Sequence, residues 1–234
     1  RYLFFTTRLG IVKRTSVEAF SNIRSNGLIA IGLKDGDELV SVLETAGDST
    51  IIIGTHGGYS VTFKEAAVRD MGRTAAGVRG IRLRDEDYVV GVAPLTDDKE
   101  VLVITENGYG KRTAGTEYPI KGRGGKGIKT ANITAKNGPL AGLTTVNGDE
   151  DIMVITDKGV IIRFNVDGVS QTGRATLGVK LIRVDDGSKV AGLTKVPDSE
   201  DEENTDTTAD AEIVATPAIT EDIAAVDDTS DDEN

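Results

Sequence analysis

The chain repeats a hairpin pattern four times, and this repeat restricts the fold more than any other feature of the sequence. Each copy has a β-branched-rich run, a tight turn that ends in glycine, and a second apolar run. The turn glycines are separated by 48, 50 and 51 residues along the chain. The copies are YLFFTTRLGIVKRT (2–15), TIIIGTHGGYSVTF (50–63), EVLVITENGYGKRT (100–113) and DIMVITDKGVIIRF (151–164), with turn glycines Gly10, Gly58, Gly108 and Gly159.

Two further strand signals follow each hairpin at similar offsets, the first of them 17 to 19 residues after the turn glycine. A second glycine, here called the loop glycine, precedes an extended stretch, and a third apolar run closes the unit. The loop glycines are Gly27, Gly77, Gly127 and Gly178, and the stretches after them are 28–33, 78–83, 128–133 and 179–184. Four short strands in each unit of about 50 residues are typical of propeller-type blades. A conventional two-sheet β-sandwich is the alternative, but it does not explain the repeat.

We therefore predict an all-β, propeller-like fold of repeated four-stranded blades. The four blades are expected at about 1–48, 49–98, 99–148 and 149–195, with one possible helical turn at 63–71. Blades bury their faces on their neighbours, so consecutive copies support one another.

The charge is distributed unevenly. The chain has a net charge of −11, yet all 27 Lys and Arg residues lie within 1–195. Residues 196–234 hold 15 of the 38 acidic residues, so the body carries 27 − 23 = +4. The last segment has high charge and few large apolar residues, which predicts a disordered acidic C-terminal tail. A mildly basic body favours a polyanionic partner.

Composition excludes several classes of site. The chain has no Cys, which excludes disulfides, zinc–thiolate sites and thiol nucleophiles and suits a reducing compartment. No apolar run approaches the length of a membrane span, and no signal peptide opens the chain. The first residue is Arg, so we expect a fragment of a longer protein. The single histidine, His56, lies in a turn, and Tyr2 opens an apolar strand, so we expect no catalytic residue.

Basic residues recur in the long loop before each loop glycine. The copies read SNIRSNG (21–27), MGRTAAG (71–77), KGRGGKG (121–127) and TGRATLG (172–178), and the last three contain Gly-Arg. A nucleotide-binding P-loop is excluded at 121–129, because Ile128 stands where the motif requires lysine and no helix follows.

A row of such loops instead indicates phosphate binding along a polyanion. Glycine lets a phosphate approach the protein backbone closely, and the Arg guanidinium can donate two hydrogen bonds to phosphate oxygens. These groups contact the backbone of a nucleic acid and do not read bases. Aromatic residues are too sparse for a single-strand stacking platform, so duplex DNA is the expected ligand. A solvated rim on a protein-interaction scaffold is the alternative. The predicted DNA-binding residues are Arg73, Arg79, Lys111, Arg112, Lys121, Arg123, Lys126, Lys129, Arg163, Arg174 and Lys180.

The segments YLFFTTRLGIVKRT, MGRTAAGVRGIRL, TENGYGKRTAGTEYPIKGRGGKGIKT and GRATLGVKLIRV resemble the C-terminal domain of the DNA gyrase A protein. The resemblance covers essentially residues 1–195 and implies a six-bladed β-pinwheel that wraps duplex DNA, of which four blades are present. It also implies an ATP-dependent type II topoisomerase, with the gyrase B protein as partner, in the bacterial cytoplasm at the nucleoid. ATP and Mg²⁺ would be used by other parts of that enzyme, so no cofactor is expected in this chain.

The family's signature loop, Gln-Arg-Arg-Gly-Gly-Lys-Gly, belongs to its first blade and is not present here. The loop at 121–127 is similar but has Lys121 and Gly122 at the first two positions. The essential role of the signature loop is therefore not assigned to the loop at 121–127, although Arg123 and Lys126 match the basic positions of the signature. The corresponding C-terminal domain of topoisomerase IV is the alternative within the family.

Overall fold

A computed structural model describes residues 1–23 and 25–196, and these residues form short antiparallel sheets. The expected acidic tail lies outside the described residues, apart from Val196. The strands are β1 (Tyr2–Thr7), β2 (Ile11–Ser16), β3 (Leu39–Thr45), β4 (Thr50–Thr55), β5 (Tyr59–Lys64), β6 (Val78–Arg79), β7 (Val89–Pro94), β8 (Glu100–Thr105), β9 (Tyr109–Ala114), β10 (Ile128–Lys129), β11 (Leu140–Val146), β12 (Asp151–Thr156), β13 (Ile161–Asn165), β14 (Val179–Lys180) and β15 (Val190–Lys195).

Short 3₁₀ turns follow the second strand of each hairpin, where the sequence allowed a helical turn in the second repeat. They are η1 (Val17–Phe20), η2 (Glu65–Ala67), η3 (Gly115–Glu117) and η4 (Val166–Gly168). None of the helices within the described ranges is long and apolar enough to cross a membrane.

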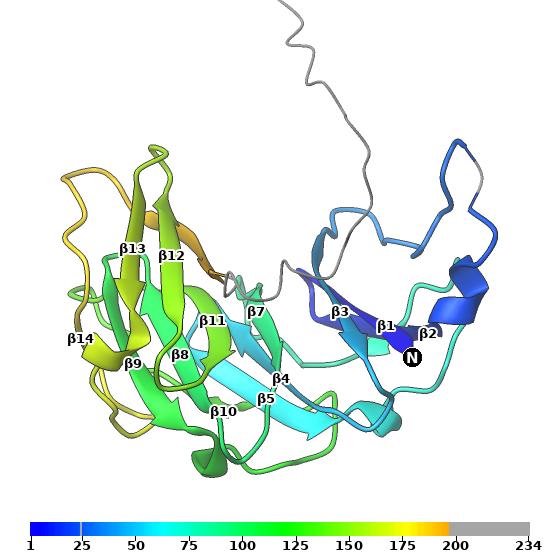
Figure 1. Cartoon of the computed structure of the whole chain (residues 1–234), viewed down its shortest axis with the longest axis horizontal. Coiled ribbons are helices and arrows are strands. Elements are labelled where there is room, and N and C mark those ends of the chain that lie inside the picture. The colour runs from blue at the N-terminus through cyan, green and yellow to red at the C-terminus, as the bar shows by residue number, and fades with distance from the viewer. Residues whose placement is uncertain (24, 197–234) are drawn as a thin grey trace, which may run out of the picture. The chain divides into compact units, whose positions relative to one another are not determined.

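Each of the first three predicted hairpins forms the centre of one blade (Figure 1), whereas β13 of the fourth hairpin is an edge strand of its sheet. The third apolar run of the same repeat pairs with the first hairpin strand, as β3 does with β1 and β7 with β4. The sheet orders are β3-β1-β2-β6, β10-β5-β4-β7, β11-β8-β9-β14 and β13-β12-β15. The predicted all-β blade architecture is therefore confirmed.

The fourth strand of a blade comes from the following repeat. β6 pairs with β2, β10 with β5, and β14 with β9, so these three exchanged strands join neighbouring blades. The expected blade bounds group each of these strands with its own repeat, whereas in the structure it belongs to the sheet of the preceding repeat. Burial explains the exchange, because Ile81, just beyond β6, is 2% exposed and packs under the turn glycine Gly10 of the preceding blade.

The first and fourth repeats differ from the two repeats between them. Residues 28–33 were expected to be a strand, but they form none, since no earlier hairpin in this chain offers them an edge. The fourth sheet is three-stranded within the described residues, because no exchanged strand pairs with β13 there. Apolar side chains are exposed at both places, with Ile29 69% and Ile161 60% exposed.

The loop glycines allow each exchanged strand to lie close to the preceding hairpin. Gly77, Gly127 and Gly178 have φ of +100°, +72° and +79°, a region that side chains disfavour. An added Cβ would stand 2.5–2.6 Å from a carbonyl oxygen of the preceding blade, on Val12, Ser60 or Gly110 respectively. Gly27 also has a positive φ, but a Cβ there would meet nothing within 4 Å.

This difference predicts a graded series of alanine substitutions. Gly127→Ala should combine a φ penalty of about 1–2 kcal/mol with a clash against the Ser60 carbonyl. Gly27→Ala should cost the φ penalty alone, and Gly122→Ala, in open space, should change stability by less than about 0.5 kcal/mol. Urea denaturation followed by circular dichroism measures all three. Equal losses for Gly127→Ala and Gly27→Ala would contradict the close approach.

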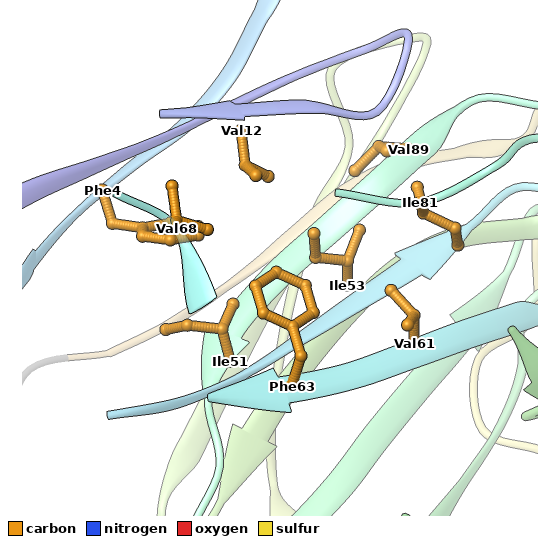
Figure 2. Packing of buried hydrophobic residues seen from close by; sticks show 9 residues of the cluster. All are labelled: Phe4, Val12, Ile51, Ile53, Val61, Phe63, Val68, Ile81 and Val89. Carbon is orange, nitrogen blue, oxygen red and sulfur yellow. The ribbon is translucent and has the colours of Figure 1, made fainter. Parts of the chain in front are cut away.

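The core lies between neighbouring blades as well as within them. At the first junction Phe4 and Val12 of one blade meet Ile51, Ile53 and Phe63 of the next, as Figure 2 shows. The Phe4 and Phe63 rings are tilted at 45° with centroids 6.3 Å apart. Equivalent clusters join the second blade to the third and the third to the fourth. The blades therefore form a continuous packed series that sets the spacing of their loops.

Candidate nucleic-acid interface

The three Gly-Arg loops, residues 71–77, 121–127 and 172–178, dock in the same way on successive blades. The first amide of each loop donates a hydrogen bond to the second hairpin strand of the preceding repeat. Met71 donates to Arg14 O at 2.9 Å, Lys121 to Thr62 O at 2.7 Å, and Thr172 to Arg112 O at 2.8 Å. The fold thus repeats one loop geometry along the blades, as the sequence spacing indicated.

Basic side chains of neighbouring repeats meet at these loops. Arg79, Lys129 and Lys180 occupy the second position of the exchanged strands, and all three are exposed. The Arg123 guanidinium donates to Arg79 O at 3.1 Å, and Arg174 donates to Lys129 O at 3.0 Å. Each of these two Gly-Arg loops therefore brings its arginine beside the exposed cation of the preceding exchanged strand.

The arginines of the loops have a structural role in addition to their charge. Arg123 also donates from Nε to Ala67 O at 3.0 Å, so it bridges the loop to the preceding repeat. Arg174 is half-buried, with its guanidinium 6.0 Å from the Tyr118 ring centroid. Arg73 is also half-buried. The arginine side chains that we expected to bind phosphate oxygens therefore also make contacts between repeats.

The glycines of these loops leave open space. A Cβ at Gly72, Gly122 or Gly125 would meet nothing within 4 Å, and at Gly173 only a Glu117 oxygen at 3.8 Å. None of the four has a positive φ. Neither packing nor backbone conformation within the described chain requires glycine there, so the space is available to an external group. Lys121 and Lys126 are exposed beside it.

Three predicted DNA-binding residues contact other groups of the protein, and Lys111 is the only one of the three that is buried. Lys111 is 1% exposed and donates to the carbonyls of Gly173 and Arg174. Its burial lowers the pKa of the ammonium to about 8, with the nearby Arg174 charge also lowering it and Glu117 opposing the shift. A direct phosphate contact by Lys111 does not fit this burial, and we correct that prediction.

Arg112 and Arg163 are ion-paired on their own hairpins. Arg112 contacts Glu100 at 2.9 Å and Val169 O at 2.8 Å. Arg163 contacts Asp151 at 2.5 Å, and this pairing lowers the pKa of the Asp151 carboxyl. The sequence reasoning missed two exposed cations, Arg82 and Arg183. Both lie five residues after a loop glycine, so the same register could have identified them.

The residues considered for catalysis are explained by packing. His56 stacks on Tyr88 with ring centroids 4.4 Å apart, and its Nδ1 lies 3.1 Å from Leu140 O. The Arg14 guanidinium lies 4.4 Å from the centroid of the Tyr2 ring. Within residues 1–23 and 25–196, no group of three or more His, Cys, Asp or Glu side chains is arranged to hold a metal ion.

Comparison with known proteins gives consistent matches. The family described as "DNA gyrase C-terminal domain, beta-propeller" matches four times, at residues 1–46, 49–96, 99–147 and 150–197. The chain is 60% identical over 202 residues to the DNA gyrase A protein of Streptococcus pneumoniae, covering 86% of this chain and 25% of that protein. It is 63% identical over 193 residues to the Streptococcus pyogenes protein, covering 82% of this chain and 23% of that one. The chain thus spans about a quarter of the length of these relatives.

Solved structures show the same fold. The C-terminal domain of DNA topoisomerase IV superposes with a TM-score of 0.79 at 29% identity, covering 83% of this chain and 61% of that one. A DNA gyrase A C-terminal domain superposes with a TM-score of 0.76 at 26% identity, covering 83% and 65%. With four family matches along nearly all of the described residues, the chain belongs to the family of DNA gyrase C-terminal domains.

Proposed function

We propose that this chain is a non-catalytic module that binds and wraps duplex DNA along its Gly-Arg loops and exchanged strands. One observation carries the proposal: the fold places Arg79 beside Arg123 and Lys129 beside Arg174. With the exposed Lys121, Lys126 and Lys180, these residues form a basic row, here called the basic rim. Its spacing is fixed by the blade junctions.

The chemistry of the basic rim suits phosphates. Arg and Lys neutralise backbone charge and release counterions, so binding should be strongly salt-dependent and indifferent to sequence. The open space at Gly72 and Gly122 lets a phosphate approach the backbone amides. Because successive rim sites belong to separate blades, a duplex that contacts several of them bends, and its phosphate contacts offset the bending energy.

Within a full gyrase, this module would act together with the rest of the gyrase A protein and with the gyrase B protein. The names of the relatives support that assignment. The wrapped DNA would be supplied to a cleavage site elsewhere in the enzyme, which would use ATP and Mg²⁺ for negative supercoiling. The bacterial cytoplasm, at the nucleoid, is the corresponding location.

Ligation of nicked circular plasmid in the presence of the chain tests wrapping directly. Wrapped DNA is sealed with a shifted linking number, and the shift should grow with protein until the plasmid is saturated. Its sign gives the handedness of the wrap. DNA affinity without any shift would support binding without wrapping. If the chain has no affinity for duplex DNA even at low salt, the proposed function is wrong, and a protein-interaction scaffold replaces it.

A further inference from the structure

Two lysines of the hairpins are buried at equivalent positions. Lys13 and Lys111 each lie three residues after a turn glycine, Gly10 and Gly108, and are 0% and 1% exposed. Lysine is almost never fully buried unless its charge has partners. Neither ammonium has an acidic partner among the salt bridges of the described chain. Their partners are mainly oxygens of the Gly-Arg loops.

The Lys111 ammonium lies under the fourth repeat's loop. Its Nζ donates to Gly173 O at 2.7 Å, to Arg174 O at 2.5 Å and to Thr176 Oγ1 at 3.1 Å. All three acceptors belong to the repeat that follows the lysine. Lys13 behaves similarly, donating to Arg73 O of the second repeat's loop and to Ala30 O. In both cases the ammonium of a lysine in one repeat donates hydrogen bonds to carbonyls in the Gly-Arg loop of the next repeat.

The second hairpin provides a natural contrast, because Val61 occupies the position of these lysines. Its loop, 121–127, lies over a cavity of about 170 Å³ lined by Val61, Gly122 and Gly125. Ser60 and Thr62, which alternate with Val61 along β5, also border it, and their hydroxyls are buried without a hydrogen-bond partner in the described structure. The third repeat's loop therefore borders an unfilled space beside the strand position that carries lysine in the first and third hairpins.

We propose that Lys13 and Lys111 are positioning residues that fix the second and fourth repeats' Gly-Arg loops for phosphate contact. This inference rests on the proposed DNA-binding function. Each lysine donates hydrogen bonds to carbonyls of its loop, which fix the loop conformation, and its positive charge adds to the potential at the basic rim. The loop at 121–127 has no such lysine, and its arginine holds it from outside through the Ala67 and Arg79 carbonyls.

The charge on Lys111 is sensitive to pH near neutrality. Burial is the main cause of its lowered pKa of about 8; Arg174 lowers it as well, and Glu117 raises it. The Tyr118 phenol lies in the same environment, but burial raises its pKa, so it stays neutral there. Lys111 therefore loses its proton at a pH where ordinary lysines and all arginines keep theirs.

Stability and DNA affinity should then respond differently to pH. The folded-state pKa of Lys111 lies below its unfolded value, so above about pH 8 the unfolded chain keeps a proton that the folded chain has lost. Between about 8 and 10.5 this residue therefore makes stability rise with pH. Loss of the same charge weakens attraction to phosphate, so DNA affinity falls through about pH 8. A lysine that only stabilises the fold would not produce the second effect.

The test measures affinity for a short duplex by fluorescence anisotropy, with the whole chain, as pH rises through the pKa of Lys111. Affinity of the unmodified chain should fall with a midpoint near pH 8. Lys111→Met should bind about tenfold more weakly at neutral pH, equivalent to about 1.4 kcal/mol, and lose that midpoint. Glu117→Gln should move the midpoint to lower pH, because it removes the charge that raises the Lys111 pKa.

Val61→Lys is the matched gain-of-function variant, since it introduces the missing lysine beneath the loop at 121–127. It should fill the cavity and raise DNA affinity at neutral pH. If the unmodified chain binds DNA but Lys111→Met matches it in affinity and pH profile, the inference fails while the proposed function stands. If Lys111→Met does not fold, an unmoved midpoint in Glu117→Gln overturns the inference. No affinity in the unmodified chain overturns both.

Discussion

Replacing Arg79, Lys129 and Lys180 together by glutamate is expected to lower affinity for duplex DNA about 100-fold at low salt. Each exposed cation contributes on the order of 1 kcal/mol to phosphate binding, and about 3 kcal/mol corresponds to slightly more than two powers of ten. Their side chains occupy the same position on three exchanged strands and are exposed, so the change should leave the hairpins folded.

The salt dependence identifies the mechanism. Removing three phosphate contacts should reduce the slope of log affinity against log salt by about 3, since each contributes about 0.9. The loss should be the same for duplexes of unrelated sequence, because backbone contacts carry no base information. A loss confined to some sequences would contradict backbone binding.

A charge-matched control separates the basic rim from net charge. Glutamate at Lys34, Lys99 and Lys158 makes the same change in total charge, but these residues lie outside the Gly-Arg loops and exchanged strands. This control should retain most of the affinity. Equal losses in the two triple variants would mean that overall charge, rather than the row of loops, binds DNA.

The hairpins and their register could be predicted from sequence because their signals are local. Turn glycines, short β-branched apolar runs and a period near 50 place strands such as β4 and β8 without reference to the rest of the chain. Exchange of β6, β10 and β14 could not be predicted in the same way. A two-residue strand carries no signal for which of two neighbouring edges it joins, and that choice depends on distant packing, such as Ile81 beneath Gly10.

The candidate site was predicted only in part, and Lys111 shows why a buried residue was assigned to it. Lysines on strands are usually exposed, so this residue was assigned to phosphate contact. Aligning the repeats places it with Lys13 and with the apolar Val61 and Ile162, and opposite the buried Val103 in the hairpin. That register indicates an inward position. Its oxygen partners could not be anticipated, since they lie 62 and 63 residues away in the next repeat.

Phe63→Ala is expected to lower the free energy of unfolding by about 3–5 kcal/mol, the usual cost of removing a fully buried phenyl ring. The side chain is 0% exposed and packs against Phe4 across the junction of the first two blades. Domains of this size are stable by about 5–15 kcal/mol, so the substitution removes a large share of the total. Urea denaturation followed by circular dichroism measures it, with Ile161→Ala, at a 60% exposed position, as the control.

The shape of that transition carries further information about the fold. In a series of repeats each unit is stabilised mainly by its neighbours, so a defect at one junction weakens the coupling between the two sides. The first blade should therefore unfold at lower urea concentration than the other three in Phe63→Ala, which divides a single transition into two. Hydrogen exchange would show early loss of protection in β1 and β2, while β8 and β9 stay protected. A uniform loss of protection along the chain would instead mean that the blades unfold as one cooperative unit. Weakening the packing at one junction would then not allow the first blade to unfold separately.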